Sequence, residues 1–202
     1  MKTVLVTGAN RGLGLGFCQQ YFAQGDLVIA VCRPSACQKA LLALKALDDK
    51  RIRILCADLH SQASISQLAA NVSGNYTLDV LINNAGVSAN EPFGQWTQEA
   101  FVDNFMVNSI APSLLCQALI DSLASRAKVI QLSSGVASIS HSNQFAQAPL
   151  DAYAMSKVAL NMFTRRLALQ LNDTEKVICA ISPDGCKQTW VDKTQRVQYK
   201  RL

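Results

Sequence analysis

Tyr153 and Lys157 stand four residues apart in the stretch YAMSK, inside a helical pattern that spans residues 152–171. Residues at this spacing share one face of a helix. A phenol with an ordinary pKa of about 10 is an adequate acid but a poor base at neutral pH, and a cation within about 4–6 Å lowers that pKa. The spacing therefore suits a proton donor and its electrostatic partner; a core aromatic beside a lysine is the alternative.

A glycine-rich turn, TGANRGLG at 7–14, follows the first apolar run and opens the first helical pattern. Its glycines permit a tight turn, a close approach of the backbone to a pyrophosphate, and tight packing of helix against strand. The N–H groups at the helix start favour an anion. The turn predicts a dinucleotide site, with a plain tight turn as the alternative. The residues predicted to contact the cofactor here are Gly8, Asn10, Arg11, Gly12, Leu13 and Gly14.

Short apolar runs alternate with longer helical patterns along the chain. Strands are predicted at 4–6, 27–31, 52–56, 80–82, 129–132 and 177–181, and helices at 13–24, 35–47, 61–72, 98–123 and 152–171. Runs that are apolar throughout indicate strands buried on both faces, and the alternation indicates right-handed βαβ units. The sequence predicts one α/β domain over residues 1–183, a Rossmann-type doubly wound parallel sheet of about six strands.

The composition narrows the classes of function. The chain has 202 residues, half of them apolar, and a formal net charge of +5. Its basic residues are scattered except at the C-terminus, which disfavours nucleic-acid binding. No run approaches the roughly 20 apolar residues of a membrane span, and no secretory signal is visible. The seven cysteines are odd in number and lack metal-ligand spacing, which indicates reduced thiols, no metal and a cytoplasmic location.

Further motifs follow in order, and together they resemble the short-chain dehydrogenase/reductase (SDR) family. They are NNAG at 83–86, NFMVNSIAP around Asn108, LSS at 132–134, YAMSK, and ISP at 181–183. The pattern is most similar to sniffer-type carbonyl reductases and their C-factor relatives, over roughly residues 1–183. The resemblance implies an oxidoreductase that transfers a hydride between a nicotinamide and a small carbonyl or alcohol substrate. An SDR-like protein that binds NADP(H) with little turnover is the alternative.

The resemblance also implies a role for each motif residue. Tyr153 is the acid/base, Lys157 lowers its pKa and holds the nicotinamide ribose, Ser134 binds the carbonyl oxygen, and Asn108 holds a water that connects Lys157 to solvent. The remaining cofactor contacts that it implies are Asp58 and Leu59 near the adenine, then Asn84, Ala85, Gly86 and Pro183. The separate alternatives are a helix-interior polar group for Asn108 and a strand-end turn for Ser133 and Ser134.

The choice of nicotinamide cofactor depends on the end of the second predicted strand. A carboxylate there would bind the ribose 2′-OH, but this chain has Cys32 and Arg33, with Arg11 inside the glycine turn. Two guanidiniums suit a 2′-phosphate. The sequence therefore predicts NADP(H) rather than NAD(H); two solvated arginines are the alternative.

Two features depart from the family's pattern. Ser134 precedes Tyr153 by 19 positions, which is longer than usual and predicts a loop near the substrate. Phe145 and Pro149 would give this loop an apolar inner face. Ser140 is the second candidate for the serine that binds the carbonyl oxygen, and His141 is expected to be solvated.

Family members also often pair through their long helices, which implies a homodimer through residues 98–123 and 152–171.

The second departure is the tail, residues 184–202. Relatives continue with a tryptophan and a T-D-M motif through a substrate-covering segment to a seventh strand. Codons for Asp184 onward, read from the third base of the first codon, can encode W-M-Q-T-D-M-G. The sequence thus predicts an atypical tail derived from a frameshift, which truncates the fold at the C-terminus. Sequencing the coding DNA tests this, since an alternate frame without that motif would contradict it.

Overall fold

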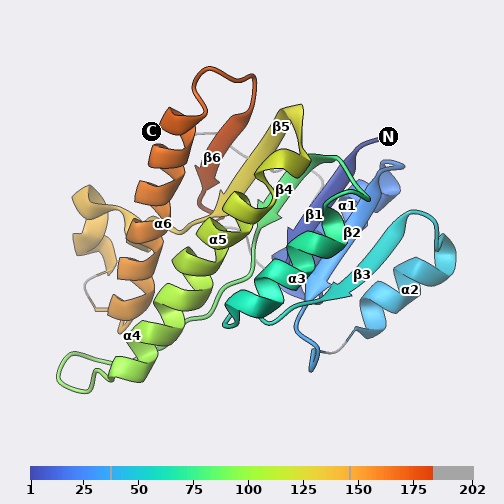
Figure 1. The fold of residues 1–202 in the computed structure, drawn as a ribbon. Coiled ribbons are helices and arrows are strands. Elements are labelled where there is room, and N and C mark those ends of the chain that lie inside the picture. The colour runs from blue at the N-terminus through green and yellow to red at the C-terminus, as the bar shows by residue number, and fades with distance from the viewer. Residues whose placement is uncertain (37, 146, 184–202) are drawn as a thin grey trace.

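The computed structural model describes residues 1–36, 38–145 and 147–183. Six parallel strands form one sheet in the order β3-β2-β1-β4-β5-β6 (Figure 1). This confirms the predicted doubly wound α/β fold. The strands are β1 (Thr3–Thr7), β2 (Leu27–Cys32), β3 (Ile52–Cys56), β4 (Leu78–Asn83), β5 (Leu123–Leu132) and β6 (Val177–Ile181).

Helices cover both faces of the sheet. They are α1 (Gly12–Ala23), α2 (Lys39–Leu47), α3 (Gln62–Val72), α4 (Gln98–Phe105), α5 (Ala111–Ala118) and α6 (Asp151–Gln170). Figure 1 shows α3, α5 and α6 next to one another across one face, and α1 and α2 pack together on the other. Each face encloses a core because successive strand residues point to opposite sides: Val4 and Val6 pack with Phe22 of α1, whereas Leu5 packs with Leu68 of α3.

The prediction of a single helix over residues 98–123 is wrong. The helix is interrupted by a π turn at Met106–Ile110, resumes as α5, and ends at Ala118, and Leu123 already begins β5. Pro112 gives the physical reason, because proline has no N–H to donate to the carbonyl four residues earlier. That carbonyl belongs to Asn108. The helix predicted at 35–47 also starts later, at Lys39.

The strand order reverses beside β1. β2 pairs with one edge of β1 and β4 with the other, so the segments that leave β1 and β4 start next to each other at the carboxyl edge of the sheet. Ligands of open α/β sheets bind in the crevice at such a switch point. The order therefore brings the glycine turn and Asn84–Gly86 together.

Residues 184–202, with the predicted frameshift-derived tail, lie outside the described residues. Within the described part of the chain, none of the helices combines the length and apolar character required to cross a membrane.

Candidate active site

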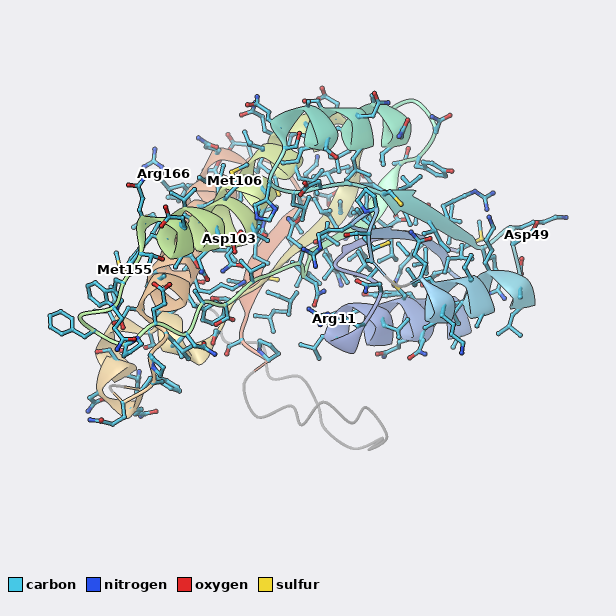
Figure 2. The ribbon with its side chains drawn as sticks, turned by 90° about the horizontal axis from the view of Figure 1, so that it is seen from below. Arg11, Asp49, Asp103, Met106, Met155 and Arg166 are labelled. Atoms are coloured by element: carbon cyan, nitrogen blue, oxygen red, sulfur yellow. The ribbon has the colours of Figure 1, made fainter. Side chains whose placement is uncertain are left out.

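A cleft of about 950 Å³ lies at the switch point. Figure 2 shows Arg11 at this side of the molecule, at the start of α1. Most of the predicted site residues line the cleft, although they come from six separate parts of the chain. These lining residues are Gly8, Asn10, Arg11, Gly12, Leu13, Arg33, Leu59, Asn84, Ala85, Gly86, Tyr153, Lys157 and Pro183.

The three glycines of the turn differ in what their missing side chains permit. Gly8 (φ +64°) and Gly12 (φ +53°) adopt left-handed conformations that disfavour other residues. A Cβ on Gly14 would lie 2.3 Å from the Gly8 carbonyl oxygen, whereas one on Gly12 would meet nothing within 4 Å. Gly14 is therefore required for α1 to pass close to Gly8 and the Asn84 side chain, and Gly12 leaves the backbone open to the cleft.

The start of α1 suits an anion. Arg11 occupies the N-cap position, no side chain caps the helix, and the first turn contains no acidic residue. The first N–H groups of a helix have no partner within the helix, and its dipole favours negative charge there. A cationic N-cap adds to both effects, so this turn can bind a phosphate.

Thr7 joins the glycine turn to the segment after β4, and the sequence reasoning did not single it out. Its Oγ1 accepts hydrogen bonds from the backbone N–H groups of Asn84 and Ala85, each at 3.1 Å, and its carbonyl accepts one from Asn84 Nδ2 at 2.9 Å. The signal in the sequence that could have identified Thr7 is its hydroxyl at the last position of the first strand.

The structure brings Tyr153 and Lys157 together in the cleft. Lys157 Nζ lies 5.7 Å from the centre of the Tyr153 ring and donates a hydrogen bond to the Leu132 carbonyl at 2.7 Å. Only 4% of Lys157 is exposed. Burial disfavours the charged form and lowers the Lys157 pKa to about 8. The Lys157 side chain is thus mostly protonated at neutral pH. Its pKa is also close enough to neutrality for it to release the proton.

The two serines after β5 differ in their surroundings. Ser133 Oγ donates to Asn161 Oδ1 of α6 at 2.7 Å, and the Ser133 N–H donates to the Ile181 carbonyl at 2.8 Å. Ser133 thereby fastens β5 to α6 and β6. Ser134 follows with an extended backbone, so its side chain points away from that of Ser133. The role of Ser134 as a carbonyl-binding residue stays a prediction.

Asn108 lies behind the cleft and is fully buried within the π turn. Its Oδ1 accepts from the Val87 N–H at 2.9 Å, and its Nδ2 donates to the Val87 carbonyl at 2.8 Å and to Ser156 Oγ at 2.9 Å. The amide therefore holds the segment after β4 against α6. π turns often occur at functional sites. The predicted water would have to bind another atom of Asn108, since both amide hydrogens already have partners.

Asp58 is exposed at the adenine end predicted for the cleft. Its Oδ1 accepts hydrogen bonds from the His60 backbone N–H at 3.0 Å and from His60 Nδ1 at 3.1 Å. His60 Nε2 bonds to Asp103 of α4, which Figure 2 labels. The Asp103 and Asp58 carboxylates raise the pKa of His60, and the bonds from His60 lower the pKa of Asp58. His60 lines the cleft, and sequence reasoning missed it because Asp103 is distant along the chain.

The loop between Ser134 and Tyr153 forms short 3₁₀ turns and a second hollow of about 350 Å³. Phe145, Ala148 and Leu150 contribute its apolar part, and Asp151 contributes a carboxylate. Ser140 and His141 are exposed and bond to each other at 3.0 Å. The substrate role of this loop stays a prediction.

The fold and the site define a protein of the doubly wound α/β class with an anion-binding turn and a tyrosine–lysine pair in one cleft. The family model for short chain dehydrogenases matches residues 2–200. The chain belongs to the short-chain dehydrogenase family, as its motifs predicted.

Individual relatives give the same result. L-xylulose reductase from Homo sapiens is 30% identical, over 90% of this chain and 70% of its own. The NADPH-bound carbonyl reductase from chicken fatty liver is 31% identical and superposes with a TM-score of 0.82, over 91% of this chain and 79% of its own. Sniffer of Caenorhabditis elegans, described as a carbonyl reductase, is 34% identical with a TM-score of 0.81, over 90% of this chain and 83% of its own.

Proposed function

We propose that this protein is an NADP(H)-dependent oxidoreductase that transfers a hydride between the nicotinamide and a small carbonyl or alcohol substrate. The observation that carries the proposal is the buried Lys157 ammonium, 5.7 Å from the Tyr153 ring in a cleft that begins at the glycine turn. The carbonyl reductase described as NADPH-bound, at 31% identity, supports the same chemistry.

The cleft offers groups for both the pyrophosphate and the 2′-phosphate of a phosphorylated dinucleotide. Gly12 and the uncapped start of α1 offer backbone N–H groups to a pyrophosphate. Arg11 and Arg33 line the same cleft, and guanidiniums bind phosphate in a bidentate manner. When bound, the dinucleotide supplies or accepts the hydride.

The chain's own residues would manage the proton and the orientation. In the direction of reduction, the Tyr153 hydroxyl donates its proton to the developing alkoxide, and the Lys157 ammonium stabilises the phenolate that remains. Ser134 donates a hydrogen bond to the carbonyl oxygen and orients it. With a pKa of about 8, Lys157 can return a proton to the phenolate at neutral pH.

We assign the predicted proton-relay water to the backbone carbonyl of Asn108 rather than to its side chain. The side-chain amide is engaged by Val87 and Ser156. Pro112 cannot supply the N–H that an α-helix would donate to this carbonyl, so the break in the helix favours a water at that place. The sequence itself indicates this, because Pro112 follows Asn108 by four residues.

We also propose a homodimer through α4, α5 and α6. Met155, Met162 and Leu169 recur every seven residues on α6 and are each at least half exposed, and Ile110 is exposed at the end of the π turn. Met106 and Met155 lie on the same side of the molecule in Figure 2. Exposed apolar side chains that repeat along one side of a helix suit an interaction site. A cytoplasmic location stays a prediction.

The test compares wild type with Tyr153→Phe. We expect wild type to oxidise NADPH in the presence of some member of a panel of small aldehydes and ketones. Tyr153→Phe should keep its NADPH affinity within about twofold and lose at least roughly a hundredfold in kcat, because only the proton donor is removed. Unchanged kcat in the variant would remove the assignment of the acid. NADPH binding by wild type without turnover of any compound would favour the alternative, a binding protein.

A further inference from the structure

Two cysteines end neighbouring strands at the edge of the sheet that forms the cleft. Cys32 is the last residue of β2 and Cys56 the last of β3, and the two are register partners in the parallel pair. Adjacent strands lie about 4.8 Å apart, and disulfides join Cα atoms about 4.4–6.8 Å apart. Register partners in a parallel pair also point to the same face of the sheet, so the Cys32 and Cys56 side chains are neighbours. The register therefore places the two Cα atoms at a spacing that a disulfide can join.

The pair adjoins the part of the cleft assigned to the adenosine ribose. Cys32 lines the cleft, and the next residue is Arg33, the proposed ligand of the 2′-phosphate. Cys56 is followed by Ala57, which also lines the cleft. Gln38 Nε2 donates a hydrogen bond to Cys56 Sγ at 3.3 Å. The Cys56 thiol thus ties the segment that starts at Arg33 to the end of β3.

The two thiols differ in accessibility in the way that a two-step exchange requires. Cys56 is exposed, whereas Cys32 is 3% exposed. Burial is the main cause that raises the pKa of Cys32, and its neighbour Cys56 adds to the effect. Two other thiols, Cys18 of α1 and Cys116 of α5, are buried with pKa values raised to about 12 and about 11, so neither offers an accessible thiol for the first step.

We propose that Cys32 and Cys56 form a reversible disulfide that modifies the adenosine end of the cofactor site. The oxidant is a low-molecular-weight disulfide. The Cys56 thiolate attacks one of its sulfurs, forms a mixed disulfide and releases one small thiolate. The Cys32 thiolate then attacks the Cys56 sulfur and releases the second. Two protein thiols are oxidised, one small disulfide is reduced to two thiols, and both protons leave with those thiols.

The bond would weaken cofactor binding, a consequence that rests on the proposed function. It removes the thiol that accepts a hydrogen bond from Gln38 Nε2. The segment that begins at Arg33 loses this anchor, and the guanidinium is displaced from the 2′-phosphate. Exposed disulfides are among the more easily reduced, so the exposure of Cys56 favours reversibility.

The test uses the full chain equilibrated in buffers of varied glutathione disulfide and glutathione, then alkylated and analysed by mass spectrometry. Wild type should lose two hydrogens and give a crosslinked peptide that joins Cys32 and Cys56. Cys32→Ser should instead carry a glutathione adduct on Cys56, and Cys56→Ser should show neither product. Cys37→Ser is the control for the neighbouring cysteine in sequence and should crosslink as wild type does.

Binding provides the second measurement. Oxidation should raise the Kd for NADPH by about tenfold in wild type, as expected for loss of one charge-assisted contact, and reductant should restore it. The Kd of Cys56→Ser should not respond to the oxidant. Absence of the Cys32–Cys56 peptide at every ratio would overturn the proposal, and a crosslink without a change in Kd would overturn its consequence. Failure of the reduced protein to bind NADPH would overturn the proposed function instead, because the mass measurement needs no cofactor.

Discussion

Burial of the Lys157 ammonium sets the residue-scale chemistry of this site. The unfolded chain keeps the ordinary Lys pKa of 10.5, whereas the folded protein lowers it to about 8. Between these values the unfolded state binds a proton that the folded state does not, so the free energy of unfolding rises with pH across that window. Burial of the charged Lys157 therefore lowers the free energy of unfolding, and it does so most at and below neutral pH.

A comparison with Lys157→Met isolates the contribution of Lys157 to the pH dependence of stability. From about pH 7.5 to about pH 9.5, we expect wild type to gain about 2 kcal/mol more in free energy of unfolding than the variant. Denaturant titrations of the cofactor-free proteins at the two pH values measure the difference. Parallel pH dependence of the two proteins would show that Lys157 is not held at a lowered pKa.

Arg33 is the second residue on which the proposal depends. Arg33→Asp should weaken NADPH binding by about 10–100-fold, because a charge-assisted contact is replaced by repulsion, and should improve binding of NADH. Isothermal titration with both cofactors measures the preference. Arg126→Asp is a matched control, since Arg126 is largely exposed on β5 and makes one long ion pair with Glu175. An Arg33→Asp variant that prefers NADPH as strongly as wild type would remove the assignment.

At the scale of elements, His60 joins the loop after β3 to α4. Its ring contacts Asp58 of that loop and Asp103 of α4. The Asp103 hydrogen bond is the main cause that raises the His60 pKa. A raised histidine pKa contributes stability that is fully present below the unfolded value and is lost as pH rises through the folded one. The contact between these elements should therefore be stronger at mildly acidic pH, where His60 is protonated, than at alkaline pH.

His60→Gln tests this coupling, because glutamine keeps an amide donor without the charge. We expect the variant to lose about 0.5–1 kcal/mol relative to wild type at about pH 6 and less at about pH 9, since partly exposed ion pairs are screened. Thermal melts at both pH values measure the effect. Equal losses at the two values would mean that the charge of His60 does not matter.

At the scale of the whole molecule, the apolar face of α6 predicts assembly. Wild type should sediment as a dimer, and Met162→Glu should shift it toward monomer because a carboxylate would be buried in the interface. Leu42→Glu is the matched control: Leu42 is about as exposed but lies on α2, on the other face of the sheet. Analytical ultracentrifugation distinguishes the outcomes, and a monomeric wild type would contradict the proposed dimer.

The local features of the fold follow from short-range patterns. The apolar runs that became the strands, the glycine turn, and the four-residue spacing of Tyr153 and Lys157 each depend on residues close in sequence, where side-chain type and backbone preference act directly. The error at residues 98–123 has the same origin. The spacing of apolar residues continues through the break in the helix. It carries no information about the missing N–H of Pro112, which interrupts the helix.

The sequence by itself determined the class of fold, the family, and most of the residues that line the cleft. Only the tertiary structure decided which atoms these residues contact: Lys157 with the Leu132 carbonyl, Asn108 with Val87, His60 with Asp103, and Cys32 beside Cys56. These partners lie more than twenty positions apart along the chain. Such contacts depend on strand order and register, which are set by the packing of the whole sheet and not by any local spacing.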